Sequence, residues 1–234
     1  MEWCASCSRN SKPVEVKSKM NKLKILYVKT RDLTNYVLGP IRRMGLHHYP
    51  FTIISNNCWG AHCYRYYRLP YDTPTIGLYI FTPDYIRMVQ NLRHYMEQEL
   101  RFISCDESKY CDILRARGEE QVPIGLLDDV EIVFLHYKSR EEALEKWQRR
   151  VKRIHWDNLY FKLSEMNECT DEHLKAFDAL PYKNKFVFTI HPRPDIRCAI
   201  HYPGYEQQGY ISDDTTFFSR GLNLRRFANG MLWK

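Results

Sequence analysis

Residues 51–60 read Phe-Thr-Ile-Ile-Ser-Asn-Asn-Cys-Trp-Gly, an apolar run that is followed at once by a polar turn. The run Phe51–Ile54 predicts a short buried strand. In an open α/β sheet, ligands bind outside the carboxyl ends of the strands. The turn brings a hydroxyl, two amides, a thiol and an indole to that position. The sequence therefore predicts a ligand site that includes Ser55, Asn56, Asn57, Cys58 and Trp59.

From Phe51 onward, segments typical of strands alternate with segments typical of helices. Strands are expected at 75–81, 100–103, 110–115, 123–127, 131–136, 158–163, 185–190 and 197–202, and helices at 63–69, 82–96, 139–153 and 170–181. This alternation predicts an α/β fold, layered α/β/α around a mostly parallel sheet. The short strands crowded into residues 100–127 indicate an antiparallel insertion, so the predicted sheet is mixed.

The amino-terminal segment is expected to be a flexible basic tail at 1–22, followed by a single α/β domain at 23–234. Leu23–Val28 fits either a short strand or the start of an amphipathic segment. Thr34–Met44 has roughly helical spacing, which Gly39-Pro40 is expected to interrupt.

The charge of the chain favours partners that carry phosphate. The net charge is +7, and three basic stretches account for it: the tail through Lys24, residues 138–153, and residues 215–234. Such stretches attract nucleotides, anionic lipids or nucleic acids. No motif that reads RNA or DNA accompanies them, so nucleic acid is not expected. The 17 tyrosines suit a groove that binds sugars, or else a tyrosine-rich surface.

The cysteines and the hydropathy predict a cytoplasmic protein. The eight cysteines are irregularly spaced, and Met1–Lys22 has no apolar stretch of the kind found in secretory signals, which favours reduced thiols. Cys4 and Cys7 have the CxxC spacing, but a single such pair is weak evidence for zinc, and no metal site is predicted. No apolar run approaches the roughly 20 residues of a membrane helix. Peripheral membrane contact through the basic stretches stays open.

A second candidate site follows the predicted strand 131–136. Ser139, with Glu142 three residues later, forms a capping box that opens a helix. The helix dipole and Lys138 favour an anion there, and Arg150 extends the positive field. This pattern predicts a phosphate or diphosphate site, as on a nucleotide-sugar. The alternative is that Ser139 only caps the helix and the arginine is solvated.

Further residues are candidates for catalysis. Cys58 with His136 or His191 fits a thiolate nucleophile and its base, although a cysteine at a strand end is more often buried and inert. Asp157 is a candidate general base. Trp59 and Tyr71 fit a stacking wall for a sugar ring, or packing over the end of the sheet. The chain has no phosphate-binding Gly-rich loop, HExxH or GxSxG, which disfavours kinases, zinc proteases and standard serine hydrolases.

Seven distinctive sequence motifs lie in the middle of the chain. They are Ile54-Ser-Asn-Asn-Cys-Trp-Gly60, Thr73–Gly77, Asp84-Tyr-Ile86, Asp129–Ser139, Ala143–Arg150, Arg153–Asn158 and Phe177–Lys185. Together they resemble a bacterial family defined by a domain of unknown function, whose members are often labelled exopolysaccharide or capsule biosynthesis proteins. The resemblance implies an α/β fold and a role in making or modifying surface glycans. It assigns no catalytic residues.

The expected function is a glycosyltransferase-like transfer from a phosphate-activated sugar donor, with the need for a divalent metal left open. The expected roles are phosphate binding for Lys138, Ser139 and Arg150, sugar binding for Asn56, Asn57 and Trp59, and proton transfer for His136 or Asp157. Two alternatives remain. One is acyl transfer or hydrolysis of glycans through Cys58, and the other is a non-catalytic protein that binds glycans or assembles with other capsule proteins.

Overall fold

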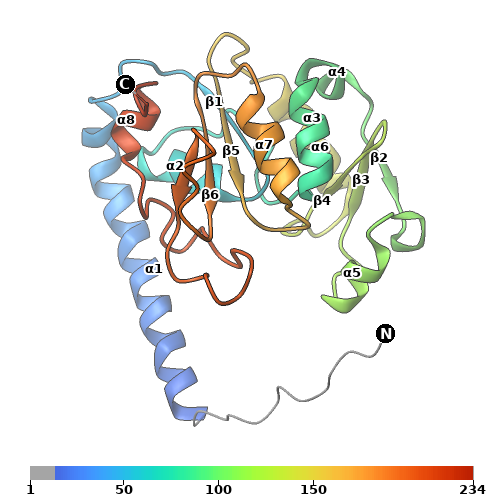
Figure 1. The fold of residues 1–234 in the computed structure, drawn as a ribbon, viewed down its shortest axis with the longest axis horizontal. Coiled ribbons are helices and arrows are strands. Elements are labelled where there is room, and N and C mark those ends of the chain that lie inside the picture. Colours follow the sequence, from blue (N-terminus) through green and yellow to red (C-terminus); the bar gives the residue numbers. More distant parts are fainter. Residues whose placement is uncertain (1–13, 234) are drawn as a thin grey trace.

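The core of the protein is a parallel sheet of four strands (Figure 1). In spatial order they are β1 (Thr52–Ser55), β5 (Leu159–Ser164), β6 (Lys185–Thr189) and β7 (Ala199–His201). The computed structural model describes residues 14–233, and their side chains from Ile25 onward. The register pairs Ile53 with Tyr160 and Leu163 with Val187. The predicted α/β fold with a mostly parallel sheet is confirmed.

Helices cover both faces of this sheet. Successive side chains of a strand point to opposite faces, so Ile54 joins one apolar cluster and Ile53 the other. Residues of α3 (Thr82–Gln90) and α7 (Asp171–Ala179) belong to the first cluster, and residues of α2 (Trp59–Tyr66) and α8 (Leu224–Ala228) to the second. The architecture is therefore layered α/β/α.

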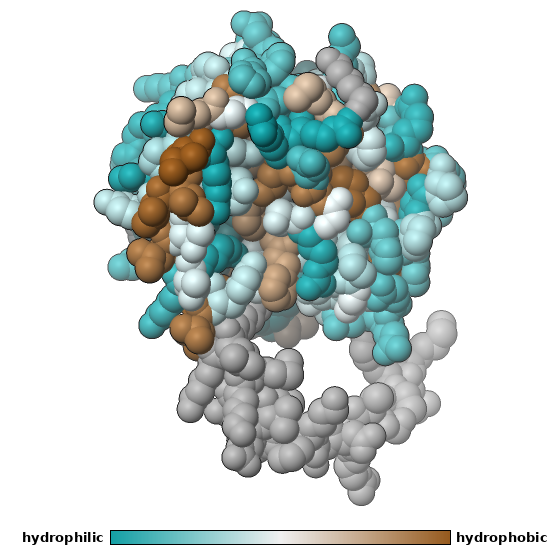
Figure 2. All heavy atoms as spheres, turned by 90° about the vertical axis from the view of Figure 1, so that its left-hand side faces the viewer, coloured by the Kyte–Doolittle hydropathy of each residue, from teal (hydrophilic) through white to brown (hydrophobic). Residues whose placement is uncertain are grey.

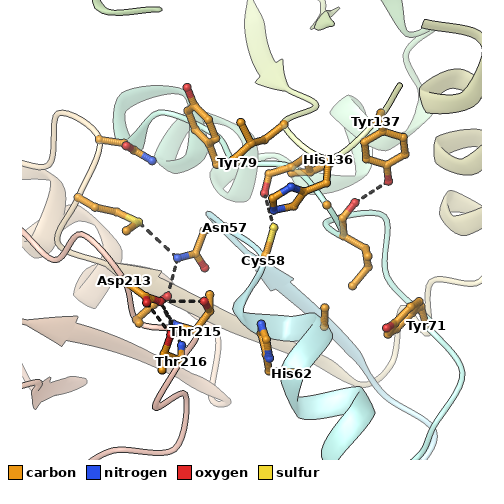
Figure 3. A pocket seen from close by; sticks show the side chains of 18 of the residues that line it. Asn57, Cys58, His62, Tyr71, Tyr79, His136, Tyr137, Asp213, Thr215 and Thr216 are labelled. Atoms are coloured by element: carbon orange, nitrogen blue, oxygen red, sulfur yellow. Dashed lines mark hydrogen bonds between the residues drawn. The ribbon is translucent and has the colours of Figure 1, made fainter. Parts of the chain in front are cut away.

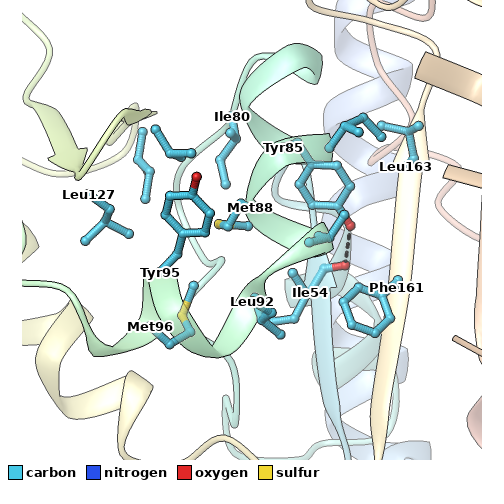
Figure 4. Packing of buried hydrophobic residues seen from close by; sticks show 14 of the residues in the cluster. Ile54, Ile80, Tyr85, Met88, Leu92, Tyr95, Met96, Leu127, Phe161 and Leu163 are labelled. Carbon is cyan, nitrogen blue, oxygen red and sulfur yellow. Dashed lines mark hydrogen bonds between the residues drawn. The ribbon is translucent and has the colours of Figure 1, made fainter. Parts of the chain in front are cut away.

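Helix α3 is joined to the sheet by packing and by hydrogen bonds (Figure 4). Its Tyr85 hydroxyl donates to the carbonyl oxygens of Ile54 at 2.9 Å and of Lys162 at 3.0 Å. The helix ends before Asn91, and α4 (Leu92–Glu97) follows, so the helix predicted at 82–96 is divided in two. Both helices contribute to the first apolar cluster.

A second, antiparallel sheet accounts for the predicted insertion. It consists of β2 (Arg101–Ile103), β3 (Ile124–Leu127) and β4 (Val130–Val133). The segment predicted as the strand 131–136 belongs to this sheet and not to the parallel one. A tight turn with Asp128 at φ 54° pairs β4 locally with β3, so its backbone groups are already satisfied. The predicted mixed sheet is thus two separate sheets.

Other local predictions also differ from the structure. Residues 75–81 bend at 76–77 and form only an isolated bridge between Tyr79 and Val133. The segment predicted as the strand 110–115 is a helix, α5 (Cys111–Ala116), preceded by the 3-10 turn η1 (Cys105–Glu107). The helix predicted from Ser139 is α6 (Arg140–Val151), and the Ser139 side chain caps it as expected by accepting from the Glu142 amide.

The amino-terminal part of the described chain is one long helix, α1 (Val14–Arg43). It begins inside the segment expected to be a flexible tail and contains Pro40, which was expected to interrupt it. Pro40 lies in the last turns, where little helix remains to be broken. Cys4 and Cys7 lie outside the described residues. Within residues 14–233, no helix is long and apolar enough to cross a membrane.

Candidate functional site

A cavity of about 700 Å³ opens beyond the carboxyl ends of β1 and β5 (Figure 3). Distant parts of the sequence meet there: the turn after β1 with α2, residues 76–79, residues 117 and 119, residues 135–137 with α6, residues 166–167, and the loop 212–216. This is the edge at which open α/β sheets bind ligands.

Helix α2 presents one face to the cavity. Cys58 precedes the helix, and His62 and Arg65 follow at intervals of about one turn. The Cys58 thiol donates to the Leu78 carbonyl oxygen at 3.4 Å, and burial raises its pKa. Burial, reinforced by Arg65, lowers the pKa of His62 to about 4. At neutral pH this wall therefore offers a thiol and a neutral imidazole.

Three arginines line the cavity, and none of them forms an ion pair with a carboxylate within residues 14–233. Arg150 of α6 is only 9% exposed, and its Nη1 donates to the Tyr137 hydroxyl at 2.5 Å. Arg117 donates to the Asn167 side-chain oxygen at 3.1 Å. The third is Arg65. Arg65 and Arg117 are exposed to solvent, so the cost of a buried cation without a counter-ion falls on Arg150. An anion bound in the cavity would offset that cost.

A buried polar cluster lies under the cavity. The ammonium of Lys162, on β5, donates to the Asp214 carboxylate and to Asn57 Oδ1, the latter at 2.9 Å. The Asn57 amide donates to Asp214 Oδ1 at 2.8 Å, and the Ser164 hydroxyl donates to Oδ2 of the same carboxylate. Burial lowers the pKa of Lys162, and Asp214 opposes that shift. The cluster fixes the orientation of Asn57 at the cavity floor.

The loop 212–216 closes one side of the cavity. The Asp213 carboxylate accepts from the backbone amides of Thr215 and Thr216 at 2.9 and 3.1 Å, and from both hydroxyls. Arg31 of α1 donates to the carbonyl oxygens of the same two threonines at 3.1 and 2.9 Å. The loop is therefore held from within and from α1.

Five of the residues predicted from the sequence meet in this cavity. They are Asn57, Cys58, Tyr71, His136 and Arg150. Figure 3 shows Cys58 and His136 among the side chains of the cavity, which they reach from different parts of the fold. Residues from both of the candidate sites predicted from the sequence therefore line one cavity.

The other predicted residues lie elsewhere. Ser55, Asn56 and Trp59 are fully buried, and their polar groups bond to the protein itself. The Trp59 ring packs against Phe186 instead of forming a stacking wall.

Lys138 and Ser139 line a different cavity of about 450 Å³, because β4 ends at Val133 and belongs to the second sheet. Asp157 is exposed in the turn before β5, at the amino edge of the parallel sheet. His191, exposed after β6, is not among the lining residues.

Some residues of the site were missed. His62, Arg65 and Arg117 carry no distinctive sequence pattern, whereas two other signals were available. Lys162 stands in an otherwise apolar strand, where a lysine is rarely buried without a partner. Its partner, Asp214, lies in the polar run Ser-Asp-Asp-Thr-Thr at 212–216. Within residues 14–233, no group of three or more His, Cys, Asp or Glu side chains is arranged to hold a metal ion.

A family model and a protein of similar sequence match this chain. A family model described as a domain of unknown function, DUF1919, matches residues 29–233. A protein of Haemophilus influenzae, described as an uncharacterized protein, is 35% identical over 176 residues, which is 75% of this chain and 78% of that protein. The match to the family model includes every residue of the cavity and the second half of α1. The chain therefore belongs to the DUF1919 family.

Proposed function

We propose that the protein transfers a sugar from a phosphate-activated donor, such as a nucleotide-sugar, in the synthesis of exopolysaccharide or capsule. The observation that carries this proposal is the set of three arginines around one cavity without a carboxylate partner in the described chain. Guanidinium groups bind phosphate through paired N–H donors and keep their charge at all physiological pH values. The resemblance to proteins labelled for exopolysaccharide synthesis supports the choice of pathway.

We assign the donor one orientation from the residues that line the cavity. Its diphosphate lies between Arg150 and Arg65, and the sugar lies toward Asn57 and Tyr71, where an amide and an aromatic ring meet hydroxyl groups and ring carbons. Arg117 lines the same cavity. A volume of about 700 Å³ is in the range of pockets that hold ligands of this size.

The transfer breaks the bond between the anomeric carbon of the sugar and the donor phosphate oxygen. A new bond forms between the same carbon and a hydroxyl oxygen of the acceptor, whose proton passes to His136. Negative charge grows on the departing diphosphate, and fixed guanidinium donors stabilise that charge most strongly in the transition state. His136 is assigned this role because it lines the cavity without belonging to its buried hydrogen-bond cluster.

The cysteine-dependent alternative is less well supported. A nucleophilic cysteine needs a lowered pKa. The Cys58 thiol has a raised one, and it donates to a backbone carbonyl.

Thermal unfolding with a panel of nucleotide-sugars tests the proposal. A donor at 100 times its dissociation constant stabilises the folded state by about 2.7 kcal/mol. For a chain of this size, this raises the melting temperature by roughly 5–10 °C. Arg150→Gln is expected to weaken donor binding by about tenfold or more, since it removes a charged hydrogen-bond donor.

Arg149→Gln is the matched control, because Arg149 directly precedes Arg150 in α6 and pairs with Glu145 on the exposed face. His136→Ala is expected to abolish release of nucleoside diphosphate while leaving donor binding intact. If no donor in the panel stabilises the protein, or if both arginine variants bind equally well, the proposal is wrong.

A further inference from the structure

Helix α1 carries an apolar face that points away from the rest of the protein. Leu33 is 66% exposed and Val37 59%, and further exposed members are Ile25, Leu26, Tyr36, Leu38 and Ile41. Met44, directly after the helix, is 81% exposed. Figure 2, which looks onto the side of the molecule that carries α1, shows apolar side chains gathered in a band at the left of the view. Apolar patches of this kind mark sites of protein or membrane contact.

The opposite face of α1 is already occupied by the fold. Arg42 donates to the Asn35 side chain at 2.6 Å and stacks over the Tyr66 ring at 4.0 Å. Tyr27 packs against Phe217, with ring centroids 5.0 Å apart. The position of α1 is therefore fixed by its inner face. Among the outer residues, Tyr36 still contacts the fold, with the Arg68 guanidinium 4.2 Å from its ring, whereas Leu33, Val37 and Ile41 are each more than half exposed.

The apolar face is too broad for a helix–helix seam. At about 100° per residue, the exposed apolar side chains from Ile25 to Leu38 are spread over roughly 220° of the circumference, an arc that also contains Lys29, Thr30 and Thr34. A coiled-coil partner covers only the narrow stripe of its a and d positions. A broad apolar face instead suits a helix that lies in the boundary between lipid headgroups and acyl chains.

The basic side chains that lie among these apolar ones favour an anionic surface. Lys29 and Arg43 are exposed on α1, while Asp32 is engaged by Arg31 at 3.3 Å. The sequence through Lys24 adds six basic residues against two acidic ones. Two copies of α1 would bring basic flanks together, whereas anionic lipid headgroups complement them.

We infer that α1 docks the protein on an anionic membrane surface, with Leu33 and Val37 at the centre of the inserted face. The helix lies parallel to the membrane plane and does not cross it. This inference does not depend on the donor assigned to the cavity, because it rests on the opposite side of α1.

Co-sedimentation with vesicles of phosphatidylcholine, with and without phosphatidylglycerol, tests the inference. The full chain is expected to bind the vesicles that contain phosphatidylglycerol and to lose binding as salt is raised. The double variant Leu33→Glu/Val37→Glu is expected to bind at least about tenfold more weakly. Reversing Lys29 or Arg43 to Glu is expected to weaken binding roughly fivefold each, on anionic vesicles only.

Tyr210→Glu is the matched control, because Tyr210 is 53% exposed and lies in a loop outside α1. Circular dichroism checks that every variant is folded. Failure of the full chain to bind anionic vesicles overturns the inference. So does unchanged vesicle binding by the double variant. Light scattering that shows a dimer which the double variant converts to a monomer, without vesicle binding, assigns the face to a second copy instead.

Discussion

The buried pair of Lys162 and Asp214 permits a quantitative prediction: Asp214→Asn will strongly destabilise the protein. Both side chains are fully buried. The carboxylate accepts hydrogen bonds from Lys162, Ser164 and Asn57. The amide keeps the size of the side chain but removes the charge that faces the ammonium. The variant therefore isolates the electrostatic contribution from packing.

The expected loss is about 3–5 kcal/mol at pH 7, the usual result of removing one partner of a buried ion pair. A domain of this size has a total stability of about 5–15 kcal/mol, so the variant is expected to be folded but marginal. The exposed pair of Arg149 and Glu145 on α6 provides the comparison. Glu145→Gln is expected to change stability by no more than about 0.5 kcal/mol.

Urea denaturation measures these losses, and its pH dependence identifies their origin. Burial already lowers the pKa of Lys162, and Asp214 acts against that shift, so the variant lowers the pKa further. Between the folded and the unfolded pKa of a lysine, the unfolded state binds more protons, so stability rises with pH. The deficit of Asp214→Asn is therefore expected to narrow as pH rises from 7 to about 9.

The double variant Lys162→Met/Asp214→Asn is expected to recover most of the lost stability, because no unpaired charge remains. A loss below about 1 kcal/mol for Asp214→Asn would refute the reasoning, since removal of one partner leaves a buried charge without compensation and should cost more. A double variant no more stable than Asp214→Asn, or a deficit that widens with pH, would refute it equally.

Three smaller predictions concern the cavity wall. Gly77→Ala is expected to cost about 1–2 kcal/mol in urea denaturation, because φ is +75° and the new Cβ would lie 2.9 Å from the Tyr137 ring; a neutral result would contradict this. Native Cys58 is expected to react with iodoacetamide at least about tenfold more slowly than in urea, as followed by peptide mass spectrometry, because burial raises its pKa; equal rates would show an accessible thiolate. Lys138→Ala is expected to leave the affinity for a sugar donor unchanged in calorimetry, since Lys138 lines the other cavity, and a marked loss would join the two sites.

Local rules predicted much of the secondary structure. The run Phe51–Ile54 is a buried strand, and the caps at Ser139 and Thr170 open their helices as expected. These features depend on residues within one or two turns of each other, so their physics is contained in a short stretch of sequence.

Strand partners could not be predicted in the same way. The segment 131–136 has the composition of a central parallel strand, yet the turn at Asp128 pairs it with β3. Because they follow this segment, Lys138 and Ser139 line the second cavity and not the main one. Arg150, about three turns further along the chain in α6, lines the main cavity. The segment can pair either in a local hairpin or in the larger parallel sheet. Its amino-acid composition does not decide between these two partners.

The residues at the floor of the cavity were the hardest to predict. Lys162 and Asp214 are 52 residues apart, and neither has a local reason to be buried. Each is tolerated only because the other is present. A sequence shows each of them singly, and only the fold brings the pair together.

Two hydrogen bonds from Arg31 join the inner side of α1 to the loop 212–216. One helix thus contacts a wall of the cavity and carries the exposed apolar face. A force that tilts α1 acts on Thr215 and Thr216 through those bonds. If α1 docks on a membrane as inferred above, thermodynamic linkage makes any coupling through these bonds mutual. A ligand that changes the affinity of α1 for the membrane then has its own affinity changed by the membrane by the same factor.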